Sequence, residues 1–410
     1  MTHNAKQYNK RRQAGSVLIL TLILVVVLVI VGQGLLGLSV QANRMAAKQE
    51  DFVLAQCAAD AGVERAVFLM NERLANLPWS DSDLPSETGQ AVPGVDSTYS
   101  FTVISDGAGG YLISPSIGVS GDVTRTIHAE LRIKSPFSHA ILVKDTIDLK
   151  AGTVVTAIDS RVSLSPGDVD EKAEVGTSSI NSDAIALYSG STINGSLFIG
   201  PGGDIDTVIK DLSGGDVPKY VLAQMPLFPV VAPPEGLVAY SPVDVKNATA
   251  TITPSESGQY AYVDLDNSGI LSAESGDTVM YVTGDVLMGQ GSEIIVAPDS
   301  TLTIYFDGDF IAGNSSGINS ENKVPSALRF YATGPGRQKV ELKAKGEFYG
   351  VVYAPNADVI IHNSGDVYGS MVGETFEMKN SGTFFYDAAL KDVDTGGIGV
   401  EFKVTNWREE

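Results

Sequence analysis

The sequence predicts an α+β N-terminal part followed by a mostly β C-terminal part. We expect one long α-helix with a small antiparallel sheet, and after it a parallel β-helix-like domain. Three observations favour this class: an apolar run that continues into an amphipathic stretch, alternating segments between residues 99 and 133, and a short glycine-initiated motif that recurs from residue 195 onward. A chain of 410 residues has room for more than one domain.

A short basic leader, residues 1–15, ends at Gly15 and precedes the apolar run, residues 16–40. The run is too long for a secretory signal, and no small-residue cleavage pattern closes it. About 25 helical residues reach about 38 Å, enough to cross a hydrocarbon core of about 30 Å. The basic leader is predicted to stay in the cytoplasm. The predicted transmembrane segment contains Val17, Leu18, Leu20 and Val31, and a simple signal anchor would show the same features.

An amphipathic stretch continues the apolar run as far as Pro78. Apolar residues recur there at three- and four-residue steps, the helical period, and charged residues occupy the other faces. Because proline disfavours helix in the residue before it, we expect one helix from Ser16 to Leu77, about 90 Å long. We expect its apolar stripe to pack on the chain's own globular part. The stripe consists of Phe52, Ala55, Ala59, Val63, Ala66, Met70, Leu74 and Leu77.

The leader, the apolar run and the segment Ala58-Ala59-Asp60-Ala61-Gly62-Val63-Glu64 together resemble the N-terminal region of PilX-type minor pilins, within the type IV pilin and type II secretion pseudopilin superfamily. The resemblance covers residues 1–135. It implies cleavage by a prepilin peptidase after Gly15 and N-methylation of the new N-terminus, Ser16. It also implies other pilin or pseudopilin subunits as partners, contact with inner-membrane lipid in a bacterium, and later residence in the periplasm or in an extracellular filament.

One position departs from the pilin pattern. Most pilins carry Glu as the fifth residue of the mature chain, where this chain has Leu20. A buried carboxylate there is tolerable mainly when it pairs with the N-terminal amine of a neighbouring subunit. Leu20 needs no such partner, and in this respect the chain resembles the minor pseudopilins of filament tips. The departure is compatible with a subunit that starts a filament.

Composition narrows the possible partners. The formal charge of −21 disfavours nucleic acid, because phosphates would be repelled. The single cysteine, Cys57, can form no intramolecular disulfide. No cofactor motif occurs, and we expect no cofactor.

Beyond Pro78 the pattern changes to strands. Residues 79–97 are polar and rich in turn formers, which predicts a loop. Alternating segments then predict three strands, Tyr99–Ile104, Tyr111–Ser120 and Thr124–Ile133. A long helix followed by an antiparallel meander is the pilin architecture, so we group residues 41–134 as one domain.

From residue 135 to 395 the chain is rich in Gly, Asn, Asp and β-branched residues. A motif begins at Gly195, Gly284, Gly308, Gly346, Gly365 and Gly382. The spacing of the last four, 38, 19 and 17 residues, suggests β-helix coils of about 19 residues. In that register Tyr349, Tyr368 and Phe385 stack along one face, and each Gly allows a corner. An antiparallel sandwich is the alternative.

A second resemblance supports this region. The runs Tyr349-Gly350-Val351-Val352-Tyr353-Ala354-Pro355-Asn356-Ala357-Asp358 and Asp366-Val367-Tyr368-Gly369-Ser370-Met371-Val372-Gly373 resemble a domain often joined to PilX-like N-termini. That domain carries no chemistry to transfer. A Pro-rich segment, 218–254, is expected to be extended and to run along the β-helix or connect two halves of it. Residues 396–410 are predicted to be a C-terminal tail.

Few motifs point to chemistry. Asp264, Asp266 and Ser268 are weak calcium candidates, since oxygen ligands alternate there; yet Glu274 falls one residue too early for the bidentate position, which favours an Asx-rich turn. The segment Gly313-Asn314-Ser315-Ser316-Gly317 matches a nucleophile elbow but lies in a polar loop. The residues His3, His128, His139 and His362 show no metal-ligand spacing.

These features favour a structural and interaction protein over an enzyme. The favoured hypothesis is a minor pilin-like subunit of a type IV pilus or type II secretion pseudopilus, which displays the β-helix for tip assembly or adhesion, with surface glycans among the candidate ligands. One alternative is a membrane-anchored carbohydrate-active enzyme, a hypothesis based on fold alone. Another is a tethered surface scaffold that joins no filament.

Overall fold

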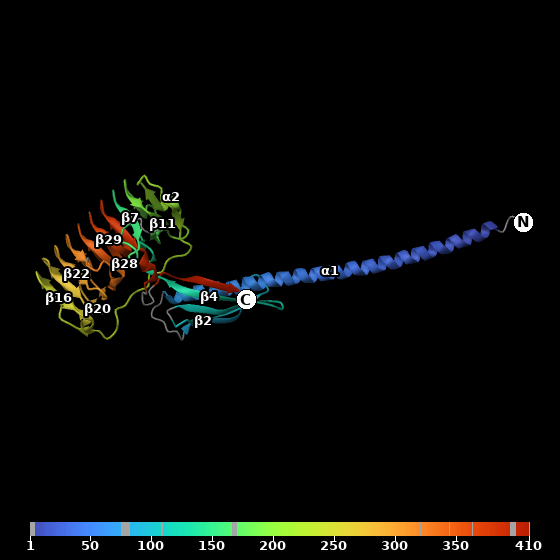
Figure 1. The fold of residues 1–410 in the computed structure, drawn as a ribbon, viewed down its shortest axis with the longest axis horizontal. Helices are drawn as coiled ribbons and strands as arrows, with labels where there is room; N and C mark the ends of the chain where they lie inside the picture. Colours follow the sequence, from blue (N-terminus) through green and yellow to red (C-terminus); the bar gives the residue numbers. More distant parts are fainter. Residues whose placement is uncertain are drawn as a thin grey trace. The chain divides into compact units, whose positions relative to one another are not determined.

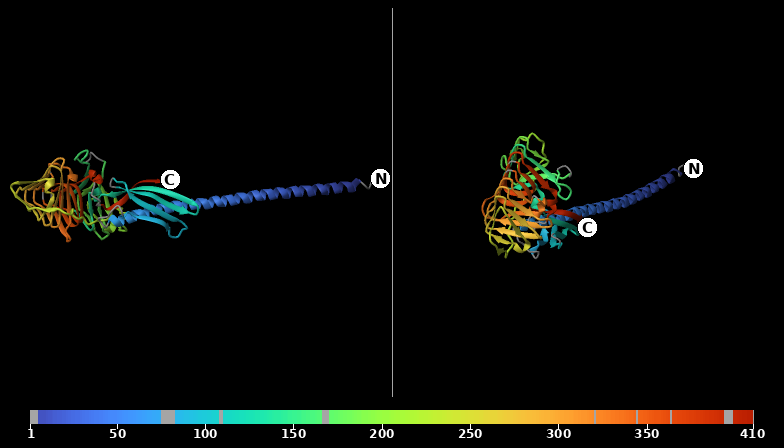
Figure 2. Two further views of the ribbon diagram at one scale, coloured as in Figure 1. Left: turned by 90° about the horizontal axis from the view of Figure 1, so that it is seen from below. Right: turned by 60° about the vertical axis from the view of Figure 1, so that its left-hand side comes forward.

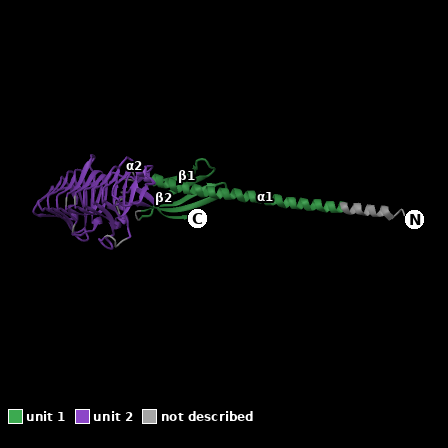
Figure 3. Ribbon diagram, turned by 90° about the horizontal axis from the view of Figure 1, so that it is seen from above, with its two compact units in different colours: residues 1–69, 81–131, 404–410 green, residues 70–80, 132–403 purple. Residues whose placement is uncertain are grey.

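The computed structural model describes residues 5–74, 83–107, 110–165, 170–319, 321–343, 345–362, 364–393 and 399–409, with side chains from Leu18 onward. The chain divides into two compact units (Figure 3). Unit 1 contains residues 1–69, 81–131 and 404–410, and unit 2 contains residues 70–80 and 132–403.

One helix, α1, runs from Ala5 to Leu74. It begins before the predicted start at Ser16, because the Lys, Gln, Arg and Ala residues of the leader are good helix formers. The predicted last residue, Leu77, lies outside the described residues. The predicted stripe is buried from Ala55 to Leu74, whereas Phe52 at its N-terminal end is 39% exposed.

The second half of α1 packs on a five-stranded sheet with strand order β1-β2-β3-β4-β31. The pairings among β1 to β4 are antiparallel. The strands are β1 Ser86–Ala91, β2 Thr98–Ser105, β3 Tyr111–Ser120, β4 Val123–Lys134 and β31 Glu401–Glu409. The three predicted strands are confirmed as β2, β3 and β4.

Two predictions about this sheet are wrong. The loop predicted over residues 79–97 contains β1, whose largely exposed, polar side chains give no apolar alternation. The predicted tail, residues 396–410, contains β31, the strand next to β4. Most of β31 is exposed, as an edge strand can be, so its sequence lacks the apolar face of a central strand.

Unit 2 is a stack of coils built from parallel strands (Figure 2), and the pairings arrange these strands in three faces. The first face contains β5 Ile141–Val143, β8 Ala173–Thr177, β11 Gly195–Ile199, β13 Lys219–Val221, β14 Val238–Ala239, β17 Gly258–Tyr260, β20 Asp277–Val282, β23 Thr301–Phe306 and β26 Leu328–Ala332. The second contains β6 Ile147–Leu149, β9 Ile185–Leu187, β12 Ile209–Asp211, β15 Val243–Lys246, β18 Val263–Asp266, β21 Val286–Met288, β24 Phe310–Ala312 and β27 Gln338–Leu342. The third contains β7 Val154–Ile158, β10 Thr192–Ile193, β16 Thr249–Ile252, β19 Ile270–Ala273, β22 Glu293–Val296, β25 Gly317–Ile318 and β30 Thr383–Asp387.

Two long strands, β28 Glu347–Ile361 and β29 Asp366–Met378, bend round the corners and contribute to all three faces. A four-residue helix, α2 Ile205–Val208, and four short 3-10 helices, η2 Pro136–Ser138, η3 Pro254–Glu256, η4 Pro325–Ala327 and η5 Ala388–Asp392, complete the described elements of unit 2. All pairings between coils are parallel, which confirms the β-helix-like domain against the antiparallel sandwich.

The coils do not follow one another in sequence order. The coil of β5 to β7 stacks on the coil of β29 and β30, so residues 141–158 pair with residues 371–387. The chain therefore enters the stack in its middle and builds outward to β13. It then crosses by a strand-free segment, 222–237, to the far end and returns coil by coil (Figure 1).

The repeat register predicted from the glycine motifs is partly wrong. The copies at Gly346, Gly365 and Gly382 do begin successive coils on the third face. The copies at Gly284 and Gly308 begin strands of the second face instead, and Gly195 begins a strand of the first. Coil length also varies, because loops at the corners absorb insertions.

Two of these three corner glycines, Gly346 and Gly382, lie close to the backbone of the neighbouring coil. The positive φ angles belong to the preceding residues Lys345, Ser364 and Ser381, at 63°, 59° and 62°. A Cβ on Gly382 would lie 3.0 Å from the carbonyl oxygen of Gly365 in the coil next to it. The corner therefore uses a left-handed residue followed by a glycine that lets stacked backbones touch.

An aromatic ladder lies on the outer surface of the third face. The rings of Tyr349 and Tyr368 stack with centroids 4.3 Å apart, and those of Tyr368 and Phe385 with centroids 4.4 Å apart. The predicted stack is thus observed, but Tyr368 and Phe385 are only half-buried, whereas their neighbours Val367 and Phe384 fill the interior. The three rings therefore stack face to face, and each ring covers part of the next one.

We expect Tyr368→Ala to lower the free energy of unfolding by about 1–2 kcal/mol, less than a fully buried ring would lose, because two stacking contacts disappear but no core cavity opens. The measurement is the denaturant midpoint of the purified chain, with the exposed Tyr262→Ala as the matched control. Equal midpoints for the two variants would show that the ladder contributes nothing.

Candidate functional site: the uncovered helix and its sheet

The N-terminal part of α1 presents an uninterrupted apolar surface. The segment Leu18–Leu74 contains an 18-residue window with a mean hydropathy of 2.9 and none of that window is buried. Between residues 18 and 40 every residue is exposed except Gly32, which is half-exposed. An apolar surface of this length is typical of a helix that enters a bilayer or packs against other helices.

The predicted membrane-span residues Leu18, Leu20 and Val31 are 73%, 70% and 51% exposed on this surface. Of the predicted processing residues, Gly15 has no side chain, and the side chains of Ser16 and of the neighbouring Val17 lie outside the described part of the structure. The backbone of all three belongs to α1.

The second half of α1 lies unusually close to β3. A Cβ placed on Gly118 would lie 1.9 Å from the carbonyl oxygen of Ala55 and 2.4 Å from the backbone nitrogen of Ala59. One turn further along, the hydroxyl of Ser116 donates a hydrogen bond to the carbonyl oxygen of Ala59, 2.7 Å away. A Cβ on Gly62 would meet that hydroxyl at 2.3 Å. Small residues on both elements therefore hold the helix on the sheet.

Charged side chains at the edges of the interface between α1 and the sheet add ion pairs and a cation–π contact. Arg65 pairs with Glu87 of β1 at 3.2 Å. The guanidinium of Arg125 covers the ring of Phe52 at 3.5 Å and pairs with Glu409 of β31 at 3.6 Å. Partial burial, with Glu409 and Glu64 nearby, raises the pKa of Asp60.

The weak calcium candidates lie in a corner of unit 2. Asp264 and Asp266 point outward from β18, and Asp266 pairs with Lys246 at 2.7 Å. Asn267 and Ser268 follow with φ of 44° and 62°, a turn between two strands. Among the described residues no group of three or more His, Cys, Asp or Glu side chains could hold a metal ion.

Two carboxylates on the second face, Asp358 and Glu341, are paired with cations. Hydrogen bonds from Arg337 lower the pKa of Asp358. Partial burial opposes ionisation of Glu341, but hydrogen bonds from Lys339 and His362 outweigh it and lower its pKa. A general acid of glycoside cleavage needs a raised pKa, so these carboxylates do not suit that role.

Unit 2 also contains a fully buried histidine, His139, whose pKa is lowered. Burial, reinforced by Lys134, lowers the pKa of His139 to about 3. Its Nε2 lies 3.4 Å from a carboxylate oxygen of Glu174, but that side chain is 38% exposed and screened by water. The imidazole is therefore neutral in the folded chain at neutral pH.

We expect the stability of unit 2 to fall as the pH drops below about 6.5, because the unfolded chain then protonates His139 and the folded chain does not. Each pH unit down to about 3 costs about 1.4 kcal/mol. Denaturant midpoints between pH 6.5 and 4.5 measure this slope, and His139→Gln should flatten it. An unchanged slope in that variant would show that other groups cause the loss.

A helix with an uncovered apolar N-terminal half, whose second half packs on a small antiparallel sheet, defines a pilin-like subunit. Residues 14–64 match the family model described as PilX N-terminal, and residues 237–393 match a domain of unknown function (DUF7305). Residues 14–64 therefore match a PilX-type N-terminus, as the first resemblance predicts, and a separate domain model covers the region of the second resemblance. No sequence among curated proteins matches the chain significantly.

Solved structures give distant likenesses. The competence-associated pilin ComZ from Thermus thermophilus has 13% identity and a TM-score of 0.30, covering 88% of this chain and 97% of its own. An ice-binding protein from the Antarctic ascomycete Antarctomyces psychrotrophicus has 12% identity and a TM-score of 0.29, covering 61% and 95%. An ice-binding protein domain from Shewanella frigidimarina has 14% identity and a TM-score of 0.32, covering 61% and 94%. Likenesses this low carry no inference about function.

Sequence reasoning missed Gly118 and β31. Gly118 interrupts an alternating strand pattern, and a glycine in a strand interior is a signal of close backbone approach. In the segment Glu401–Glu409, apolar residues alternate with polar residues only at Phe402 and Val404. This pattern is too short to predict β31.

Proposed function

We propose that this chain is a minor subunit of a type IV pilus or of a type II secretion pseudopilus, anchored in the inner membrane before assembly. Its unit 2 is displayed outside for tip assembly or adhesion. The observation that carries the proposal is the exposed apolar surface of α1 between Leu18 and Val40, continuous with a helix that packs on its own small sheet. Other pilin-like subunits and membrane lipid are the partners that would cover this surface.

Processing of the leader tests the proposal. We expect a prepilin peptidase to cut the wild-type chain after Gly15, so that N-terminal sequencing begins at Ser16, with N-methylation of that residue. Gly15→Leu should leave the leader attached because the residue at the cleavage point no longer fits. The matched control is Gly37→Ala on the same helix, where no atom apart from the neighbouring helix backbone lies within 4 Å of the added Cβ, and it should be processed normally. Met1 or Thr2 at the N-terminus of the wild-type chain would contradict this assignment.

The tethered scaffold remains the second candidate, because it needs the same exposed helix. It differs in one measurement: a scaffold stays with the membrane fraction and never sediments with sheared filaments.

A further inference from the structure

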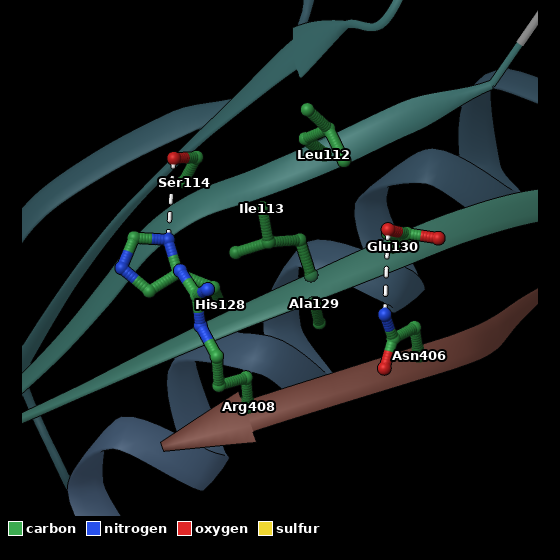
Figure 4. A pocket seen from close by; sticks show the side chains of 8 residues that line it. All are labelled: Leu112, Ile113, Ser114, His128, Ala129, Glu130, Asn406 and Arg408. Atoms are coloured by element: carbon green, nitrogen blue, oxygen red, sulfur yellow. Dashed lines mark hydrogen bonds between the residues drawn. The ribbon is translucent and has the colours of Figure 1, made fainter. Parts of the chain in front are cut away.

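A pocket lies on the face of the unit 1 sheet that points away from α1. Ile127, Ala129 and Leu131 of β4 are buried on the helix side, whereas His128 and Glu130 alternate with them and are half-exposed on the other side. The pocket encloses about 240 Å³. It is lined by Leu112, Ile113, Ser114, His128, Ala129, Glu130, Asn406 and Arg408 (Figure 4).

An irregularity in β3 opens the pocket. The pairing of β3 with β4 shifts register between Ile113 and Ser116, so Ser114 and Pro115 form a bulge. A bulge disrupts the ladder locally and redirects a side chain. The side chain of Ser114 is thereby brought next to β4.

Hydrogen-bond donors gather at one end of the pocket. The hydroxyl of Ser114 lies 3.3 Å from Nδ1 of His128. The side chain of Arg408 extends from β31 toward His128 (Figure 4). The other end holds the carboxylate of Glu130, which accepts a hydrogen bond from the amide of Asn406 at 3.4 Å. Leu112, the cross-strand partner of Glu130, adds an apolar part to the lining.

This arrangement fits a ligand with one negative charge. A guanidinium binds a carboxylate through two parallel hydrogen bonds. Because Nδ1 of His128 and the Ser114 hydroxyl bond to each other, this pair supplies one further donor, which is the Ser114 O–H when Nδ1 carries the imidazole proton. Glu130 would repel a second negative charge, which disfavours phosphate dianions. The chain as a whole is acidic, with a formal charge of −21. A pocket end formed by Arg408, Ser114 and His128 therefore differs in charge from the rest of the chain.

We propose that the His128–Arg408 pocket binds a small carboxylate with a short aliphatic body. This proposal does not depend on the filament assignment, since it uses only residues of β3, β4 and β31. The carboxylate accepts hydrogen bonds from Arg408 and Ser114, and the aliphatic part contacts Leu112.

The test uses the full-length chain in detergent micelles and N-acetylglycine as the probe. Saturation-transfer NMR should show the probe's methyl signal for the wild-type chain, at least fivefold stronger than that of the uncharged N-acetylglycinamide. Arg408→Gln should reduce the signal at least fivefold, and Ser114→Ala should reduce it less. Lys403→Gln removes one positive charge from the same strand outside the pocket and should leave the signal unchanged.

Three results would overturn the proposal: equal signals from the two probes, an unchanged signal in Arg408→Gln, or no signal from N-acetylglycine with the wild-type chain. Hydrogen exchange of β3 and β4 amides accompanies each variant. If hydrogen exchange shows that Arg408→Gln loosens the sheet, the Ser114→Ala variant becomes the deciding test. A weaker probe signal in Ser114→Ala, with hydrogen exchange unchanged, would still assign the probe to this pocket.

Discussion

Replacement of Gly118 by valine should detach α1 from the sheet of unit 1. The added Cβ would overlap backbone atoms of Ala55 and Ala59, and backbone cannot rotate aside as a flexible side chain can. Overpacking of this kind costs about 1–3 kcal/mol, and the branched side chain adds to it. Hydrogen exchange by the amides of β2, β3 and β4 should therefore become at least tenfold faster, because local opening follows local stability.

Two further variants serve as a graded comparison and as a control for Gly118→Val. Gly118→Ala adds only the Cβ and should show a smaller change in the same amides. Gly336→Ala is the neutral control, because nothing lies within 4 Å of its Cβ and its φ angle is not in the left-handed region. Unchanged exchange in Gly118→Val would mean that the helix does not pack on β3 in solution.

The sequence predicts the elements whose patterns are periodic. The small and apolar residues from Ala55 to Leu74 recur at the helical period, and the alternation along β3 and β4 is that of strands with one buried face. Both patterns follow from burial on one side, so the helix, the meander and their packing could be predicted from the residues alone.

Chain order within the stack of coils could not be predicted in the same way. The inward residues Val155 and Phe384 are both buried, yet nothing in either segment specifies that β7 pairs with β30 rather than with a strand close by in sequence. Parallel coils all present similar apolar faces, so local pattern does not distinguish one neighbour from another. The pocket at His128 could not be predicted from local pattern either, because one of its lining residues, Arg408, lies 280 positions later in the sequence.

The position of unit 2 in the sequence suggests how to remove it. The backbone nitrogen of Val400 donates to the carbonyl oxygen of Lys134 at 3.0 Å, and the Lys134 and Glu401 side chains pair at 3.3 Å. The ends of β4 and β31 are therefore already as close as the two strands of a hairpin. Residues 135–399 occupy the place of the hairpin loop, and a two-residue Asn-Gly turn between Lys134 and Val400 should close it.

We expect this shortened chain to keep the sheet of unit 1 and to enter filaments, but to lose surface binding. Leu20 removes the need for a carboxylate–amine pair with another subunit, and a bulky inserted domain would crowd a helical shaft. Both features favour a filament end. Antibody against unit 2 should therefore label the ends of wild-type filaments and leave the shaft bare, and filaments that contain the shortened chain should keep the shaft's repeat. Uniform labelling would contradict the tip position. The absence of any label on filaments would favour the tethered scaffold, since a scaffold would carry the same two units without ever leaving the membrane.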